Sequence, residues 1–148
     1  MERTIMKDDS QMGSLRGERD RPSNIIDQLK YDEHGLLGAI IQDYKTNEVL
    51  MFAFMNKEAV ERTLKGPYVT FWSRSRQKYW VKGEESGHTQ EVKEVFYDCD
   101  GDALLIKVDQ KVAACHEGYR SCFFRKIEEQ TDTVIAERLF DPKQTYKK

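Results

Sequence analysis

Three cysteines, Cys99, Cys115 and Cys122, stand in the second half of the chain. Thiolates are strong zinc ligands, and a catalytic zinc site has three protein ligands and an open fourth position. The odd, low number of cysteines excludes a disulfide framework. Because the spacing is not that of a CxxC knuckle, it is a weak signal by itself. Buried structural thiols and redox chemistry therefore remain alternatives to a metal site.

Three aspartates surround the first cysteine, at Asp98, Asp100 and Asp102. Carboxylates this close together repel one another unless a cation or solvent separates them. Oxygen ligands suit Mg²⁺ or Ca²⁺. An EF-hand is excluded because Ala103 stands where its invariant glycine would be, and a strand-like segment follows. A magnesium-type site and a solvated acidic turn both remain open.

The segment 68–82 combines four basic residues, no acid and five aromatic residues. Guanidinium groups and hydroxyls suit phosphate oxygens, and aromatic faces suit a base or a sugar ring. A solvated strand with an aromatic inner face is the alternative. Residues 84–102 hold seven acids and one lysine. These opposed charges favour a site for both phosphates and metal ions.

The glycine-flanked loop 82–92 follows, and its polar side chains include His88. Such a loop can bring backbone N–H groups and an imidazole to a ligand, although many loop histidines are merely exposed.

The overall balance of charge and hydropathy excludes two broad classes. The chain has 148 residues, and 24 Lys and Arg against 26 Asp and Glu give a net charge of −2. This near-neutral balance argues against a general nucleic-acid binder. The mean hydropathy is −0.76 and no apolar run approaches ~18 residues, which excludes a membrane-spanning helix. Because the N-terminal residues lack the apolar core of a signal peptide, we expect a cytoplasmic protein.

The elements that must position these residues are mostly strands. We expect a flexible lead-in over 1–24, one domain over 25–140 and a polar tail over 141–148. A helix should begin after the N-cap Asn56 and end at Gly66, with Ala59, Val60, Thr63 and Leu64 as its apolar positions. The first two strands, 36–43 and 47–54, are nearly continuously apolar, so both of their faces should be covered.

Further strands are predicted after the helix, with glycines in the loops between them. The expected fold class is α+β, rich in mostly antiparallel sheet, with one main helix. The predicted strands are 68–75, 78–82, 90–98, 103–109, 122–127 and 133–140.

Taken together, these segments resemble the phosphoribosyl-AMP cyclohydrolases of histidine biosynthesis, from about Leu29 to Arg125. The matching motifs are NEVLMFAFMNKEAV, TFWSRSRQKYWVKGE, SGHTQ, CDGDALLIKV and ACH…SCFFR. The resemblance implies hydrolytic opening of the adenine ring of 1-(5-phosphoribosyl)-AMP between N1 and C6. It also implies one Zn²⁺ and one Mg²⁺ per subunit, and an intertwined homodimer with each zinc site at the subunit interface.

The resemblance also assigns roles to residues of this sequence. It implies zinc ligation by Cys99, Cys115 and Cys122, some of them from the partner chain, and magnesium ligation by Asp98, Asp100 and Asp102. For proton transfer we expect His116 first and His88 second. Zinc acidifies its bound water, which would supply the nucleophile. The candidates for binding the substrate are Trp72, Ser73, Arg74, Ser75, Arg76, Trp80, Lys82, Glu84 and Ser86.

The sequence departs from the family pattern at three places. Val112 stands where a glycine is common, which predicts an ordinary, non-glycine backbone angle there. Glu117 and Glu85 replace smaller polar residues. Because the sequence ends at Lys148, we expect one activity, without the pyrophosphohydrolase domain that some relatives carry as a fusion.

Two other classes of function stay open at this point. One is a small zinc-stabilised RNA-binding module that uses the segment 68–82. The other is a non-catalytic β-rich interaction domain with buried thiols.

Overall fold

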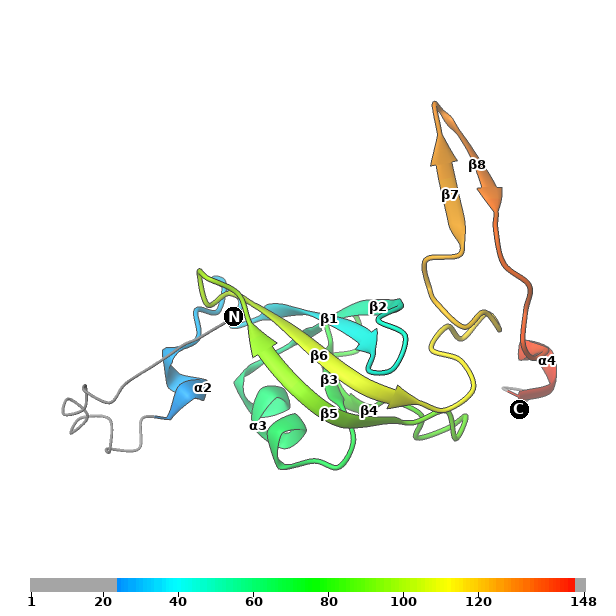
Figure 1. The fold of residues 1–148 in the computed structure, drawn as a ribbon. Helices are drawn as coiled ribbons and strands as arrows, with labels where there is room; N and C mark the ends of the chain where they lie inside the picture. The colour runs from blue at the N-terminus through cyan, green and yellow to red at the C-terminus, as the bar shows by residue number, and fades with distance from the viewer. Residues whose placement is uncertain (1–23, 146–148) are drawn as a thin grey trace.

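A four-stranded sheet organises the chain (Figure 1). Its order is β2-β1-β6-β5, with antiparallel pairs at both edges and the parallel pair β1–β6 in the middle. The computed structural model describes residues 24–145, so the lead-in predicted over 1–24 lies outside the described residues except for Asn24. The bounds of the four strands are β1 Leu37–Asp43, β2 Val49–Met55, β5 Gln90–Tyr97 and β6 Ala103–Gln110.

Helix α3 (Lys57–Lys65) follows β2 and begins where its N-cap predicts. The Asn56 side chain accepts a hydrogen bond from the Ala59 N–H at 2.9 Å, which satisfies one of the unpaired donors of the first turn. Gly66 ends the helix with a φ of 72°. Of the four apolar positions, Ala59, Val60 and Thr63 are buried, whereas Leu64 is 44% exposed.

The core lies between α3 and the inner face of the sheet. Side chains alternate along β1, so Leu37, Ala39 and Ile41 point inward and are buried. The opposite face carries Ile40, Phe52 and Phe96, which are 37%, 48% and 45% exposed. The expectation that both faces of the first two strands are covered is therefore wrong within one chain. We call these three residues the outer apolar face.

A short hairpin closes the core beside α3. Its strands are β3 (Thr70–Ser73) and β4 (Lys78–Val81), paired antiparallel. Phe71 is fully buried and contacts the ring of Trp80 at 4.8 Å between centroids. The Thr63 hydroxyl on α3 accepts a hydrogen bond from the Thr70 N–H at 3.0 Å, which fixes the hairpin against the helix.

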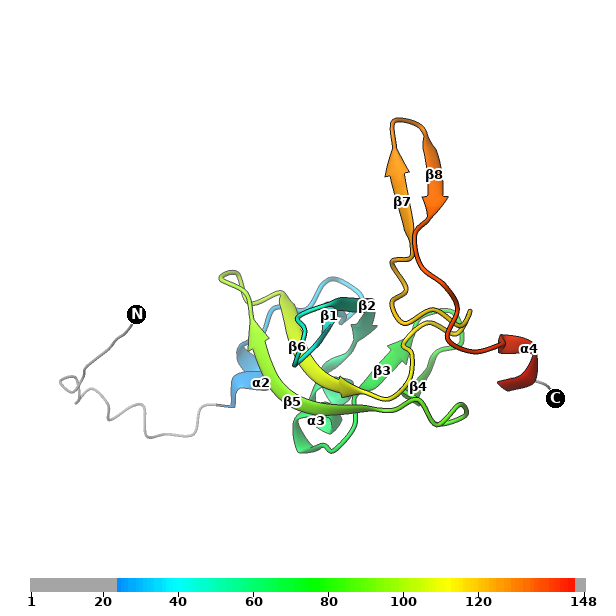
Figure 2. The ribbon, with the colours of Figure 1, turned by 45° about the vertical axis from the view of Figure 1, so that its right-hand side comes forward.

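A second hairpin, β7 (Arg125–Glu128) with β8 (Thr131–Val134), stands away from the sheet in both views (Figures 1 and 2). Every residue of its two strands is exposed. The last predicted strand, 133–140, is mostly wrong, because β8 ends at Val134 and the chain then turns back toward the sheet. There the Leu139 N–H donates to the Gly118 carbonyl at 2.6 Å.

We call residues 135–145 the C-terminal strap. It includes the short helix α4 (Pro142–Thr145). Another short helix, α2 (Ile25–Gln28), precedes the sheet. In the described part of the chain, three sheets with one parallel pair among antiparallel ones confirm the predicted β-rich α+β class. Within residues 24–145, no helix has the length and apolar character needed to cross a bilayer.

Candidate functional site

The aspartate cluster lies in the turn between β5 and β6. Carboxylate oxygens of Asp98, Asp100 and Asp102 all lie within 4.8 Å of one another, and the three residues are exposed. Partial desolvation favours the neutral form of Asp98, but hydrogen bonds from Asp102 and from the backbone of Ala103 and Gly101 together outweigh it and hold the pKa of Asp98 below its usual value. The hydrogen bond and charge of Asp98 raise the pKa of Asp102. Oxygen atoms grouped in this way fit a hard cation such as Mg²⁺.

The three cysteines do not form one cluster within the described chain. Cys99 lies in the aspartate turn, before β6 begins, whereas Cys115 and Cys122 lie beyond its far end. With eight residues and a rise of ~3.3 Å each, β6 separates its two ends by roughly 25 Å. One chain therefore supplies either Cys99 or the pair Cys115 and Cys122 to any single metal ion.

Cys115 and Cys122 themselves are neighbours. Cys115 is buried, and its sulfur accepts a hydrogen bond from the Glu117 N–H at 3.4 Å. Cys122 is exposed as a residue, but the surroundings of its thiol are dehydrated. This burial and the nearby Cys115 raise the pKa of Cys122 to about 11, while the charge of Lys82 opposes them. Paired thiols with few other partners are a donor set that fits zinc.

Two anchors hold the loop between these cysteines. The Cys122 N–H donates to the Leu50 carbonyl at 2.7 Å, which ties the loop to β2. Arg120 forms an ion pair with the buried carboxylate of Asp43 at 2.7 Å, at the end of β1. Hydrogen bonds from Arg120 also reach the carbonyl of Val112 at 3.2 Å. These contacts fix the cysteine pair relative to the main sheet.

Val112 precedes this loop and departs from the sequence expectation. Its φ is 56°, in the left-handed region that glycine adopts most easily. The expected ordinary backbone angle is therefore wrong, because the loop keeps a glycine-like geometry although the side chain is branched at Cβ.

A cavity of about 380 Å³ gathers many of the predicted site residues. We call it the loop cavity. The β3–β4 hairpin and the loop after β4 form one side of it, and His116 forms the other. Of the predicted residues, it brings together Arg76, Trp80, Lys82, Glu84, Ser86 and His116.

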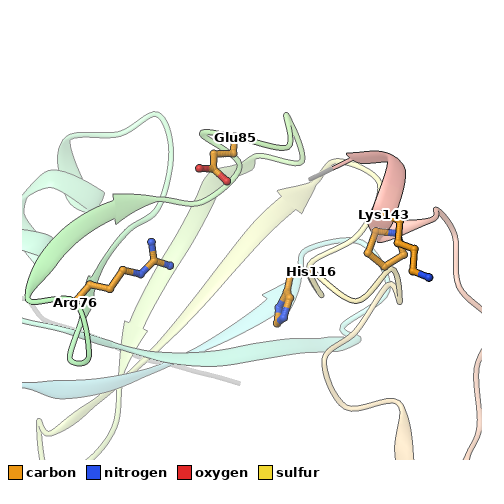
Figure 3. A pocket seen from close by; sticks show the side chains of 5 residues that line it. Arg76, Glu85, His116 and Lys143 are labelled. Atoms are coloured by element: carbon orange, nitrogen blue, oxygen red, sulfur yellow. The ribbon is translucent and has the colours of Figure 1, made fainter. Parts of the chain in front are cut away.

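The C-terminal strap adds residues that sequence reasoning missed. An adjoining cavity shares Arg76, Glu85 and His116 with the loop cavity and is completed by Pro142 and Lys143 (Figure 3). Nothing in the polar composition of the tail indicates this position. It depends on contacts distant in sequence, such as the hydrogen bond from Arg138 to the Glu117 carbonyl at 2.8 Å.

The two candidate histidines have different surroundings. His116 is exposed and lines both adjoining cavities. His88 is half-buried, and its ring packs edge-on against Phe140 at 4.8 Å between centroids. Burial and the charge of Lys82 lower the pKa of His88, so its imidazole is neutral at neutral pH. His116 is thus the better placed of the two to touch a ligand in these cavities.

The remaining predicted residues lie elsewhere on the hairpin. Trp72 and Arg74 line a separate cavity of about 500 Å³ together with His34, Leu36, Asn56 and Gln77. The Arg74 guanidinium lies 4.1 Å from the centre of the Phe54 ring. Ser73 accepts a hydrogen bond from the Arg76 N–H at 3.2 Å, and Ser75 is exposed in the hairpin turn. The structure therefore divides the segment 68–82 between two cavities.

Comparison with known proteins gives a consistent result. The family model described as phosphoribosyl-AMP cyclohydrolase matches residues 51–124. A phosphoribosyl-AMP cyclohydrolase of Methanococcoides burtonii is 55% identical over 121 residues, which cover 82% of this chain and 98% of the relative. One of Pelotomaculum thermopropionicum is 56% identical over 124 residues, covering 83% and 96%. One of Chlorobium limicola is 48% identical over 131 residues, covering 88% and 96%.

Proposed function

The chain belongs to the phosphoribosyl-AMP cyclohydrolase family, and from this membership we propose that it hydrolyses the N1–C6 bond of the adenine ring of 1-(5-phosphoribosyl)-AMP in histidine biosynthesis. The product is the imidazole carboxamide ribotide with a formimino-linked phosphoribosyl group. The observation that carries the proposal is the loop cavity, where His116 faces Arg76 and Trp80 of the β3–β4 hairpin. These residues offer a proton-transfer group, a phosphate-binding cation and an aromatic surface for a purine.

The chain's donor groups support two metal sites. Cys115 and Cys122, with Cys99 of a partner subunit, would hold zinc, and the three clustered aspartates would hold magnesium. A zinc ion with three protein ligands supplies a water molecule acidic enough to attack at neutral pH. The aspartates lie in the same turn as Cys99, so the two metals would lie close together in the assembled site.

We infer a homodimer from the separation of the cysteines along β6, because a zinc ion bound by all three cysteines would need two chains. In a two-fold dimer, the aspartate turn of each chain would meet the cysteine pair of the other, which would make two equivalent sites. The outer apolar face of Ile40, Phe52 and Phe96 lies on the sheet between those two ends and supplies the surface that such a contact would bury. Intertwining through the projecting β7–β8 hairpin would add to this contact.

His116 is the proposed proton-transfer group. Its place in both cavities puts the imidazole beside any ligand that Arg76 and Lys143 hold. A positioned acid or base contributes about 10²–10⁴-fold to a rate. The neutral His88, held against Phe140, would shape the wall of the site and polarise the purine from the side.

Family membership gives no support to the RNA-binding alternative, and the charge balance argues against it. For a biosynthetic enzyme of this class, the cytoplasm remains the proposed location.

A ring-opening assay on phosphoribosyl-AMP, paired with metal analysis, tests this function. We expect turnover that a strong chelator abolishes and that added zinc and magnesium restore, with about one zinc per chain. His116→Asn should lower kcat by about 100-fold or more while the zinc content is unchanged. Steady turnover by metal-free protein would contradict the proposed chemistry, and absence of turnover with both metals bound would contradict the proposed substrate.

A further inference from the structure

Lys82 is a buried cation in the wall of the loop cavity. Its exposed fraction is only 9%, and its Nζ donates a hydrogen bond to the Ala114 carbonyl at 2.5 Å. Lysine is rarely buried without a compensating partner, because removing an ammonium group from water costs several kcal/mol. The Ala114 carbonyl and the face of the Trp80 ring, whose centre lies 5.7 Å from Nζ, offer only partial charges, so the burial needs a further explanation.

The surroundings of the ammonium supply that explanation. Burial lowers the pKa of Lys82, and negative charge on the nearby sulfurs of Cys122 and Cys115 opposes that shift, while the charge of Lys82 opposes the rise in the pKa of Cys122. Zinc binding would convert both thiols into thiolates that the ammonium can balance. The carbonyl that Lys82 holds belongs to Ala114, the residue directly before Cys115. The ammonium group of Lys82 therefore contacts the backbone of the cysteine turn, and its charge acts on the thiols of the same turn.

We propose that Lys82 is a positioning residue of the cysteine metal centre and its counter-charge, a role different from the phosphate contact that the sequence predicts for it. The inference rests on the proposed zinc site. Three thiolates and one Zn²⁺ carry a net charge of −1, and the ammonium of Lys82 balances it in a dehydrated place. The hydrogen bond to Ala114 fixes the direction from which Cys115 approaches the metal.

Arg76 can bind a phosphate in the same cavity, so Lys82 is not needed for that role. Arg76 lines this cavity, is exposed and carries a permanent charge suited to phosphate oxygens. A phosphate that bound Lys82 would have to displace a short hydrogen bond and approach two thiol groups. The geometry therefore favours phosphate binding by Arg76 and support of the cysteine metal centre by Lys82.

The test compares Lys82→Met and Lys82→Arg with Lys78→Met, which removes an exposed lysine from the same hairpin. The zinc dissociation constant of each protein is measured by competition with a chromogenic chelator, and kcat and KM are measured with zinc saturating. We expect Lys82→Met to weaken zinc binding by about 10–100-fold, as is typical when a residue that supports a metal ligand is lost. Its KM should stay within about twofold of the original value. Lys82→Arg should recover part of the affinity, and Lys78→Met should retain all of it.

Several results would overturn the inference. Unchanged zinc affinity in Lys82→Met with a KM raised tenfold or more would make Lys82 a substrate ligand instead. Equal loss of affinity in Lys78→Met would make the effect one of general surface charge.

Since a buried methionine could prevent folding, Lys82→Gln is measured in parallel, with circular dichroism of the metal-free proteins as the check. If the unmodified protein itself binds no zinc, the proposed function fails and this inference fails with it. Zinc binding by the unmodified protein that Lys82→Met and Lys82→Gln preserve contradicts the inference alone.

Discussion

At the scale of single residues, Val112 is a local conflict between side chain and backbone. Its φ of 56° places a β-branched residue in the left-handed region, which costs about 1–2 kcal/mol. The carbonyls of Gln110 and Val112 both accept hydrogen bonds from Arg120, so the loop is held in this shape by contacts beyond Val112 itself. The strain is the cost of keeping the cysteine loop in place.

Val112→Gly should therefore stabilise the protein. The substitution removes the strain, but the greater conformational entropy of glycine in the unfolded chain lowers the stability by about 0.5–1 kcal/mol. We therefore expect a net gain in the free energy of unfolding of about 0.5–1 kcal/mol. The free energy of unfolding from urea titration measures it. Val49→Gly is the matched control, because Val49 is similarly exposed (43% against 47%) but lies in β2 and should lose stability. A loss in both variants would mean that Val112 is not strained.

The residue scale is also where sequence reasoning was most uneven. The Asn56 cap could be predicted because its partner is three residues away. The burial of Lys82 could not, since it depends on the Ala114 carbonyl, 32 positions further along. Likewise, the cysteine motifs identify thiols, but only the fold places Cys99 at the opposite end of β6 from the other two.

At the scale of elements, the C-terminal strap is the part that the sequence did not predict. Local patterns predicted the strands of the main sheet with nearly correct bounds, because runs of apolar residues and turn glycines can be recognised within a few residues. The local pattern of the strap predicted a strand up to residue 140 that does not form, because the position of the strap depends on close contacts with the cysteine loop. At Gly118 the strap leaves no room for a side chain, because an added Cβ would lie 2.5 Å from the Phe140 carbonyl oxygen.

Gly118→Ala should release the strap. The new methyl group would meet both Phe140 and Arg138, and Gly118 also has a φ of 103°, so we expect a loss of about 2 kcal/mol or more. Thermal unfolding measures the stability, and limited proteolysis at residues 135–141 measures the release. Gly35→Ala is the control, because its φ is 76° but no atom lies within 4 Å of the new Cβ. Equal effects of the two substitutions would show that backbone conformation alone, and no contact with the strap, is responsible.

At the scale of the whole molecule, the single chain looks incomplete. The outer apolar face is exposed, every residue of the β7 and β8 strands is exposed, and the cysteines lie at two ends of one strand. Sequence reasoning expected the strand faces to be covered, and it had no means of telling whether the covering came from the same chain. A second copy would resolve all three features together.

Phe52→Asp should disrupt the proposed dimer. A carboxylate in the middle of the apolar contact would be buried without a partner, so we expect monomers and a large loss of bound zinc. Size-exclusion chromatography with light scattering measures the mass, and metal analysis measures the zinc. Leu64→Asp on α3 is the control, because Leu64 is similarly exposed on a different element and should leave the mass unchanged. A Phe52→Asp protein that remains dimeric would place the interface elsewhere.

The position of Cys99 apart from Cys115 and Cys122 has a genetic consequence. If each metal centre takes Cys99 from one chain and the pair from the other, a Cys99→Ser chain and a Cys115→Ser chain are each inactive alone. In a mixed dimer of the two, both lesions fall in one centre and the other centre contains only intact ligands. Two defective alleles expressed in the same cell would then complement each other, and a sequence defect would be rescued by another copy that is itself defective.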